Sequence, residues 1–255
     1  MTPIFLLCGN AGVGKDTVAD ILCNNGYGVS IAQADPIKMY AQYLFDFSYD
    51  QLWGPSSARS QTKPELSSAD WKNVIDKSSF YAGMTQRWLK YISPNEDAYL
   101  ILKKWIVNFK EKFENQKLSP RLVCQQLGTE FGRSISPDIW SELAIKNAKK
   151  LLNGGYAYLA STGPLIDVTK RGYDFVVIKD GRFRSEVLNV NCIGGKSFKI
   201  ISNEDLSPNE KHSSETEIKQ IPNSWFNRII LNDQSLGIED LNLRIKHMVI
   251  QGLLE

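Results

Sequence analysis

The residues best suited to chemistry lie in a glycine-rich segment close to the N-terminus. Residues 9–15 read GNAGVGK and satisfy the pattern G-x-x-x-x-G-K. Glycines let the backbone curl until several N–H groups point at one phosphate, and a helix that begins directly afterwards adds the positive end of its dipole. The lysine of such a loop reaches the β- and γ-phosphates of a nucleotide. The alternative is a turn with a surface lysine. We predict phosphate binding by Gly9, Gly12, Val13, Gly14 and Lys15.

The residue after this lysine departs from the common form of the motif. A Ser or Thr hydroxyl usually stands there and binds Mg²⁺, but this chain has Asp16, followed by Thr17. A hard cation accepts carboxylate oxygen, so Asp16 is a candidate Mg²⁺ ligand, directly or through water. The other interpretation is an acid in the first helical turn that complements the helix dipole. The residues leave both interpretations open.

A second group of charged residues follows the apolar run 175–178. Asp180 comes at its end, and a parallel strand there would bring this carboxylate to the same sheet edge as the glycines. Two bound phosphate groups carry more negative charge than Lys15 and one Mg²⁺ neutralise, so a phosphotransferase needs guanidinium groups. The candidates are Arg121, Arg133, Arg182 and Arg184. Each of them is equally compatible with a solvated surface position.

The predicted elements position these residues at one edge of a sheet. The run 4–8 is typical of a strand buried on both faces, and 15–25 has the spacing of a helix. A strand at 27–34 and a helix from Pro36 continue the alternation. Further strands are predicted at 173–179, 198–202 and 228–231, helices at 121–133, 137–152 and 238–253, and a mobile loop at 203–223. We predict an α/β fold, the three-layer P-loop NTPase fold, with a parallel sheet flanked by helices.

Residues 46–119 differ from the rest of the chain. They are polar and rich in aromatic residues, with helix-like stretches such as 98–113. We predict a mostly helical insertion into a core formed by residues 1–45 and 120–255. Aromatic side chains at such spacings pack in a core more often than they line a base pocket. We therefore expect core positions for Trp53, Trp71, Tyr81, Trp88, Tyr91 and Trp105.

Composition excludes several classes of protein. The 255 residues, 42% hydrophobic and 23% charged, suit one globular domain or a core with an insertion, and a net charge of +2 is too weak for general nucleic-acid or membrane attraction. The four cysteines lack zinc-site spacing, so we expect reduced, buried thiols. Without a membrane-length apolar stretch or signal peptide, we expect a cytoplasmic protein.

Four blocks resemble phage deoxynucleoside monophosphate kinases of the T-even type, within the P-loop kinases. The first is GNAGVGKDTVAD at 9–20, whose GKDT makes Asp16 regular for this family. The second is ADPIK at 34–38, and the third is QQLGTEFGR at 125–133, which precedes Trp140. The fourth combines DGRFRSE at 180–186, HSSE at 212–215 and LNDQSLGIEDL at 231–241. The order of the blocks agrees with the family, and the insertion lies outside the resemblance.

The resemblance implies a kinase that transfers the γ-phosphoryl group of ATP, with Mg²⁺, to a deoxynucleoside 5′-monophosphate and yields the diphosphate for DNA synthesis. It implies a catalytic role for Lys15, Arg133 and Arg182. Beside the glycine-rich segment, the donor site would include Asp16, Thr17 and, near the adenine, Asn232. The acceptor site would comprise Asp35, Lys38, Gln125, Thr129, Arg133, Asp180, Arg182 and Glu186, with the insertion as a nucleoside monophosphate-binding region.

The expected partners are small-molecule nucleotides, with neither nucleic acid nor membrane among them, and a homodimer is an alternative to a monomer. A phage-encoded chain would act in the host cytoplasm. Two other functions remain open at this point. One is a P-loop kinase of another small acceptor, such as a coenzyme A precursor or a nucleoside. The other is a nucleotide-binding switch without acceptor-dependent turnover.

Overall fold

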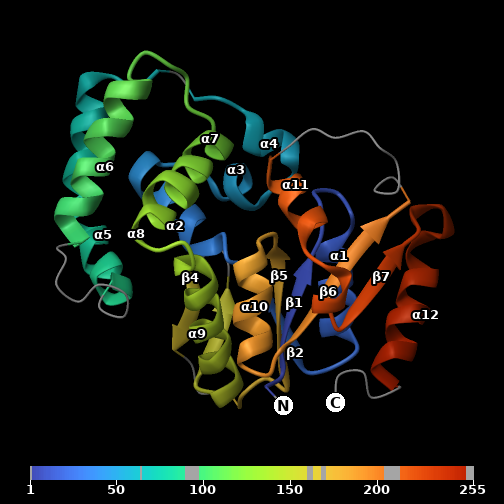
Figure 1. Ribbon diagram of the computed structural model, residues 1–255. Coiled ribbons are helices and arrows are strands. Elements are labelled where there is room, and N and C mark those ends of the chain that lie inside the picture. Colours follow the sequence, from blue (N-terminus) through green and yellow to red (C-terminus); the bar gives the residue numbers. More distant parts are fainter. Residues whose placement is uncertain are drawn as a thin grey trace. The chain divides into compact units, whose positions relative to one another are not determined.

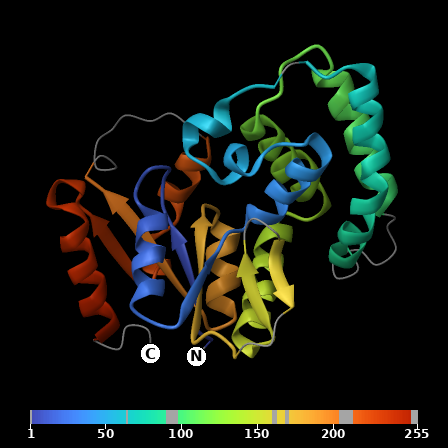
Figure 2. The same ribbon diagram turned by 180° about the vertical axis from the view of Figure 1, so that it is seen from behind.

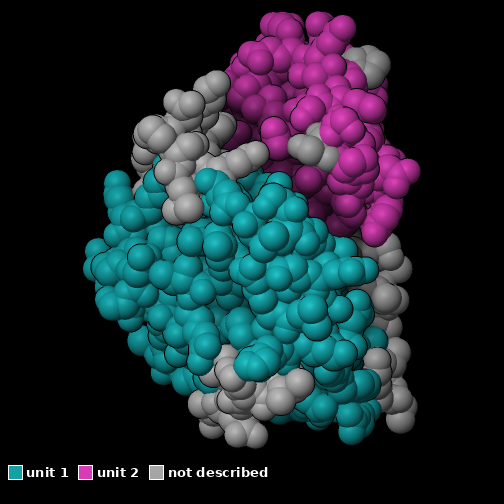
Figure 3. Space-filling model, turned by 90° about the vertical axis from the view of Figure 1, so that its right-hand side faces the viewer, with its two compact units in different colours: residues 1–33, 141–159, 164–255 teal, residues 34–140, 160–163 magenta. Residues whose placement is uncertain are grey.

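The computed structural model describes residues 2–63, 65–89, 98–159, 163–167, 171–203 and 213–250 (Figure 1). The chain divides into two compact units, which Figure 3 shows in different colours. Unit 1 contains residues 1–33, 141–159 and 164–255, and unit 2 contains residues 34–140 and 160–163. The glycine-rich segment 9–15 therefore belongs to unit 1, and the segment 34–38 belongs to unit 2.

Unit 1 is built on a five-stranded sheet in the order β2-β5-β1-β6-β7. Each pair of neighbouring strands is parallel, and all five residues of the central strand β1 are buried. A strand covered on both faces needs a continuous apolar sequence, which IFLLC supplies. The predicted parallel sheet is confirmed. Its strands are β1 (Ile4–Cys8), β2 (Gly28–Ile31), β5 (Phe175–Gly181), β6 (Lys196–Ser202) and β7 (Arg228–Asn232).

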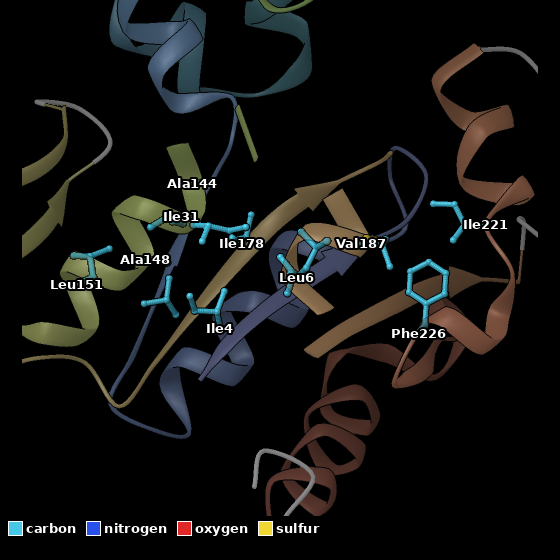
Figure 4. Packing of buried hydrophobic residues seen from close by; sticks show 14 of the residues in the cluster. Ile4, Leu6, Ile31, Ala144, Ala148, Leu151, Ile178, Val187, Ile221 and Phe226 are labelled. Carbon is cyan, nitrogen blue, oxygen red and sulfur yellow. The ribbon is translucent and has the colours of Figure 1, made fainter. Parts of the chain in front are cut away.

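Helices cover both faces of this sheet. Successive residues of a strand point to opposite faces, so the apolar strand β1 has side chains to bury on each side. Ile4 and Leu6 share a buried cluster with residues of α9, α10 and α11 (Figure 4). Phe5 and Leu7 share another with residues of α1 and α12. Figure 2 shows these two helices on the same face of the sheet. The predicted three-layer α/β fold is thus confirmed. The helices are α1 (Lys15–Asn24), α9 (Ile139–Asn153), α10 (Arg184–Cys192), α11 (Ser213–Gln220) and α12 (Gly237–Ile250).

Unit 2 is helical around an aromatic core. Trp71 is 2% exposed and meets the rings of Phe45 and Phe109 edge to face, and Phe109 stacks on Trp105. The long helices α5 and α6 pack along each other. The helices are α2 (Asp35–Phe45), α3 (Tyr49–Trp53), α4 (Ser56–Ser60), α5 (Ser68–Leu89), α6 (Ala98–Phe113), α7 (Pro120–Gln125) and α8 (Arg133–Ile135), with the π-helix η1 (Gln126–Gly132) between α7 and α8.

Several local expectations were wrong. The segment predicted as the mobile loop 203–223 contains α11, a polar helix in which Ile218 is the one apolar residue, so its periodicity is weak. Residues 204–212 of that segment lie outside the described residues. The helix predicted at 121–133 is interrupted by η1. The sequence reading also missed the two-stranded sheet of β3 (Tyr156–Leu159) and β4 (Gly163–Asp167) and the 3₁₀ turns η3 (Asn223–Trp225) and η4 (Gln234–Leu236).

The cysteines also differ in part from expectation. All four are free thiols, but only Cys8 is fully buried and Cys192 is exposed. In the described ranges, no helix combines the length and apolar character needed to cross a membrane.

Candidate functional site

The glycine-rich segment joins the end of β1 to the start of α1, as predicted. Gly12 and Gly14 adopt φ values of 83° and 86°, in the left-handed region that L side chains rarely occupy. A Cβ atom on Gly14 would also lie 2.3 Å from Nδ2 of Asn232. Both the backbone conformation and the close approach of Asn232 therefore require glycine at position 14.

Lys15 is the first residue of α1 and folds back over the loop. Its Nζ donates hydrogen bonds to the carbonyl oxygens of Gly9, at 2.8 Å, and Asn10. Burial lowers the pKa of Lys15, and the guanidinium of Arg182 lowers it further, while Asp16 and Asp180 act in the opposite direction. An ammonium group in such a positive and partly desolvated environment gains strongly from an anionic ligand.

Residues at and just after the end of the last strand, β7, donate hydrogen bonds to the glycine-rich loop. Nδ2 of Asn232, at the end of β7, donates to the carbonyl oxygen of Val13 at 2.9 Å, and Nε2 of Gln234 donates to that of Gly12 at 3.2 Å. Asn232 is 8% exposed. Sequence reasoning had assigned Asn232 to the donor adenine, which stays a prediction. Its contact with the loop, and that of Gln234, were not foreseen.

Asp16 forms an ion pair with Lys179 of β5, with 2.9 Å between Oδ1 and Nζ. The Asp16 carboxylate remains 78% exposed. Among the described residues, no group of three or more His, Cys, Asp and Glu side chains is assembled that would enclose a metal. That donor set still fits Mg²⁺, which proteins commonly bind through one or two carboxylates together with substrate phosphates and water.

Asp180 lies at the carboxyl end of β5, at the sheet edge where β1 runs into the glycine-rich loop, as the sequence predicted. Its Oδ1 accepts a hydrogen bond of 2.8 Å from the backbone N–H of Gln33, in the turn after β2. In a parallel α/β sheet, ligands bind at this edge. The register Ile31↔Ile178 between β2 and β5 explains the contact, because Gln33 and Asp180 each follow that pair by two residues.

Glu186 caps the helix that follows. Its carboxylate is 5% exposed and accepts the N–H groups of Arg182 and Phe183 at 2.7 and 3.0 Å. This leaves the Arg182 side chain exposed on a fixed backbone. The guanidinium of Arg184 instead lies over the ring of Trp225, 4.3 Å from its centroid. Of these two arginines, Arg182 is the one whose charge lowers the pKa of Lys15.

In unit 2, three residues form a polar cluster on α2 and α3. Nε1 of Trp53 donates to Oδ1 of the buried Asp35 at 3.0 Å, and Nζ of Lys38 lies 5.5 Å from the centroid of the Trp53 ring. Asp35 and Lys38 were both predicted acceptor residues. Trp53 was expected in the core, but it is half-buried and contacts both of them. Trp71 does lie in the core, while the side chains of Tyr81, Trp88 and Tyr91 lie outside the described residues.

The third resemblance block, residues 125–133, comprises the last residue of α7, all of η1 and the first residue of α8. A Cβ on Gly132 would lie 2.1 Å from the Trp140 ring, whose Nε1 donates to the carbonyl oxygen of Gly128 at 2.8 Å. A Cβ on Gly128 would approach Cδ1 of Ile37, one residue before Lys38, to 3.1 Å. The glycines of this block therefore admit Trp140 and α2. Its predicted acceptor residues are Gln125, Thr129 and Arg133, of which the first two are exposed and the third half-buried.

The predicted residues thus fall into two groups. Unit 1 contains Gly9, Gly12, Val13, Gly14, Lys15, Asp16, Thr17, Asp180, Arg182, Glu186 and Asn232, and unit 2 contains Asp35, Lys38, Gln125, Thr129 and Arg133. Sequence reasoning missed Gln33, Trp53, Lys179 and Gln234. A single amide, indole or ammonium group has no motif of its own, so only the contacts with Asp180, Asp35, Asp16 and the loop reveal these four residues.

Comparison with protein families gives a match over most of the chain. A family model described as deoxynucleotide monophosphate kinase matches residues 4–245. Among solved structures, a dephospho-CoA kinase from Campylobacter jejuni is 14% identical with a TM-score of 0.41, covering 99% of each chain. A sugar kinase from Janibacter sp. HTCC2649 is 10% identical with a TM-score of 0.33, covering 98% of this chain and 95% of that one. No curated protein sequence matches this chain.

The family match runs through both units. It includes the glycine-rich loop, the cluster around Asp35, the η1 segment, Asp180 and Asn232. The chain therefore belongs to the deoxynucleotide monophosphate kinase family.

Proposed function

We propose that unit 1 binds the triphosphate of ATP on the glycine-rich loop and that Lys15, Arg182 and Arg133 stabilise the transferred phosphoryl group. The protein is a phosphotransferase by family, with ATP as co-substrate and a deoxynucleotide monophosphate as acceptor. The observation that carries the proposal is the loop itself. It follows the central parallel strand, leads into α1 and keeps the ammonium of Lys15 at its carbonyl oxygens.

The proposed donor site follows from charge and backbone geometry. Backbone N–H groups of residues 9–15 and the N-terminus of α1 offer donors to phosphate oxygens. Lys15 would exchange its two carbonyl partners for the β- and γ-phosphates. Because burial and Arg182 lower the pKa of Lys15, phosphate binding relieves an unfavourable positive environment. Thr17, in the first turn of α1, completes the proposed donor site.

Asp16 would hold Mg²⁺ together with the donor phosphates. The metal supplies neutralisation of the phosphate charge when bound. Asp16 is exposed and would exchange its ion pair with Lys179 for this role.

The acceptor residues that the resemblance implies are proposed for each unit by itself. Asp35 and Lys38, Gln125 and Thr129, and Arg133 come from unit 2, while Asp180, Arg182 and Glu186 come from unit 1. Lys38 and the arginines match the charge of a 5′-phosphate. Glu186 would act through the backbone of Arg182, because its carboxylate accepts hydrogen bonds from the N–H groups of Arg182 and Phe183. Residues 46–119 would surround the nucleoside.

The reaction needs no covalent enzyme intermediate. An anionic oxygen of the acceptor 5′-phosphate attacks the γ-phosphorus, the bond from γ-phosphorus to the β,γ-bridging oxygen breaks, and ADP leaves as the deoxynucleoside diphosphate forms. The attacking oxygen already lacks a proton at neutral pH, so the protein contributes alignment and charge stabilisation instead of a general base. This fits a site composed of a lysine, arginines and backbone N–H groups.

The test is ADP release with ATP and Mg²⁺ in the presence of each of the four canonical deoxynucleoside monophosphates. A no-acceptor reaction and a coenzyme A precursor serve as controls. We expect acceptor-dependent turnover with at least one deoxynucleotide, and its loss by about 10³-fold in Lys15→Ala, which keeps the fold. Lys246→Ala, an exposed lysine of α12, is the matched control. A folded and fully active Lys15→Ala enzyme would contradict the assignment.

A further inference from the structure

Gln33 carries a buried side-chain amide that the described part of the chain leaves without hydrogen-bond partners. It lies in the turn between β2 and α2 and is 6% exposed. Neither Nε2 nor Oε1 has a hydrogen-bond partner among the described residues. Its backbone N–H is engaged, because it donates to Oδ1 of Asp180 at 2.8 Å. The main chain of Gln33 is therefore fixed, while its side chain still needs two partners.

Such an arrangement is uncommon for physical reasons. Removing an amide from water without replacing its hydrogen bonds is unfavourable, and about nine-tenths or more of buried polar groups in proteins are satisfied. A glutamine amide offers hydrogens on Nε2 and lone pairs on Oε1. The complement of Gln33 must therefore present a hydrogen-bond acceptor and a hydrogen-bond donor close together.

The position of Gln33 indicates where that complement comes from. Gln33 and Asp180 extend the paired strands β2 and β5 at their carboxyl ends, two residues beyond Ile31 and Ile178. Figure 4 shows Ile31 and Ile178 on these neighbouring strands. The glycine-rich loop leaves the next strand, β1, at the same edge. This edge is where parallel α/β sheets bind ligands. Gln33 lies on the side of β5 away from β1 and its loop, and its backbone is bound to Asp180, one of the proposed acceptor residues.

We propose that Gln33 binds the deoxynucleoside part of the acceptor, through a neighbouring donor and acceptor on that molecule. This inference rests on the proposed function. A phosphate oxygen without its proton accepts hydrogen bonds only, so it would satisfy Nε2 and leave Oε1 unpaired. The deoxynucleoside supplies both groups, either on the edge of the base or at the 3′-hydroxyl. An uncharged amide suits such uncharged partners.

The proposal makes opposite predictions for stability and for acceptor binding. Gln33→Leu and the unbranched Gln33→Met remove both polar atoms at similar volume. In the free enzyme they remove an unpaired buried amide, so Tm stays the same or rises. With acceptor present they remove its hydrogen bonds, so KM for the deoxynucleoside monophosphate rises about tenfold. The KM for ATP stays within about twofold, because the donor does not contact this amide.

The experiment measures Tm and both KM values for wild type, Gln33→Leu, Gln33→Met and the control Asn242→Leu. Asn242 is an exposed amide of α12, and its exchange reports what amide loss does outside the site. A 2′,3′-dideoxynucleoside monophosphate identifies the source of the contact. If the variants lose their defect with this acceptor, the 3′-hydroxyl is the partner. If the defect persists, the base edge is the partner, and the four bases are then compared.

Two results would overturn the proposal. A lower Tm of either free variant means that the amide already has a partner in the folded chain. An unchanged KM for the acceptor means that the ligand does not contact it. Failure of the proposed function looks different, since the wild-type enzyme itself would then turn over none of the four deoxynucleotides.

Discussion

The amide of Asn232 and the carbonyl oxygen of Val13 are joined by a buried hydrogen bond of 2.9 Å, although 219 residues separate them in the sequence. Val13 belongs to the phosphate loop, and Asn232 ends the last strand of the sheet. Beside this bond, Asn232 packs so closely on Gly14 that no side chain fits there. The C-terminal strand therefore fixes the conformation of a loop formed near the N-terminus.

This relationship predicts that Asn232 acts on the donor side through the loop. In Asn232→Ala the Val13 carbonyl loses its partner, at about 1–3 kcal/mol, and KM for ATP rises about tenfold or more. Asn232→Asp should be at least as harmful, because a carboxylate would then face the carbonyl oxygen. ATP and acceptor KM values, with Tm, are the measurements. Asn242→Ala serves as control, and unchanged ATP kinetics in both Asn232 variants would contradict the role.

The titration of Lys15 should make the kinetics depend on pH in the alkaline range. Its pKa in the folded, free enzyme is below that of an exposed lysine, because of burial and then Arg182. The ammonium is therefore lost at lower pH than in an ordinary lysine, and kcat/KM for ATP, which reports the free enzyme, should fall correspondingly early. Bound phosphates favour the charged form of Lys15, so kcat should fall at a higher pH than kcat/KM.

The lowered pKa of Lys15 also predicts how the stability of the fold changes with pH. Charging Lys15 opposes folding below its lowered pKa, and this penalty disappears as the pH rises from that pKa toward the value of the unfolded chain. Wild type should gain stability over this interval relative to Lys15→Met, which cannot titrate. Unfolding in urea at several pH values measures the difference. Parallel pH profiles of the two proteins would argue against the shift.

We expect substitution of Glu186 to act first on the stability of the fold, and on activity only through that change. Its buried carboxylate accepts two backbone N–H groups at the start of α10, so Glu186→Ala should reduce the free energy of unfolding by about 1–3 kcal/mol. Glu186→Gln keeps an acceptor oxygen and should recover much of the loss. Urea unfolding and acceptor KM are compared in both variants. Full stability of Glu186→Ala combined with lost acceptor binding would favour a direct contact with the nucleotide instead.

We expect substitution of Trp53 to weaken binding of the acceptor without affecting ATP. Trp53→Phe removes the donor to Asp35 and retains an aromatic ring in stacking range of Tyr49, which lies 5.3 Å away between centroids. Asp35 is 3% exposed, so it would be left without this partner in a buried place. We expect KM for the deoxynucleotide to rise several-fold, by the loss of about one hydrogen bond to a charged group, with ATP kinetics unaffected. Equal changes in both KM values would point to general unfolding of α3.

The family membership resolves the functions that the sequence had left open. A match across residues 4–245 to deoxynucleotide monophosphate kinases favours the nucleotide acceptor over a coenzyme A precursor, a nucleoside or a switch. The loop motif alone was compatible with each of them. The domain limits 1–45, 46–119 and 120–255, and the assignment of Mg²⁺ to Asp16, stay predictions.

The sequence by itself determined the phosphate loop and the parallel core. A motif such as GNAGVGK is local, because its glycines act on their own backbone, and the flanking strand and helix have short-range periodicities. The same holds for Asp180 at the end of an apolar run and for the 98–113 helix, which the structure reproduces with the same limits. Strand order β2-β5-β1-β6-β7, by contrast, depends on long-range pairing.

Only the tertiary structure decided what the polar side chains contact. Asn232 reaches Val13, Lys179 reaches Asp16 and Trp53 reaches Asp35, and no sequence spacing announces these bonds. The π-helix 126–132 and the helix α11 were also missed, the second because its sequence is almost wholly polar. Local backbone chemistry is encoded in neighbouring residues, whereas side-chain partners are selected by chain segments that meet only in the folded protein.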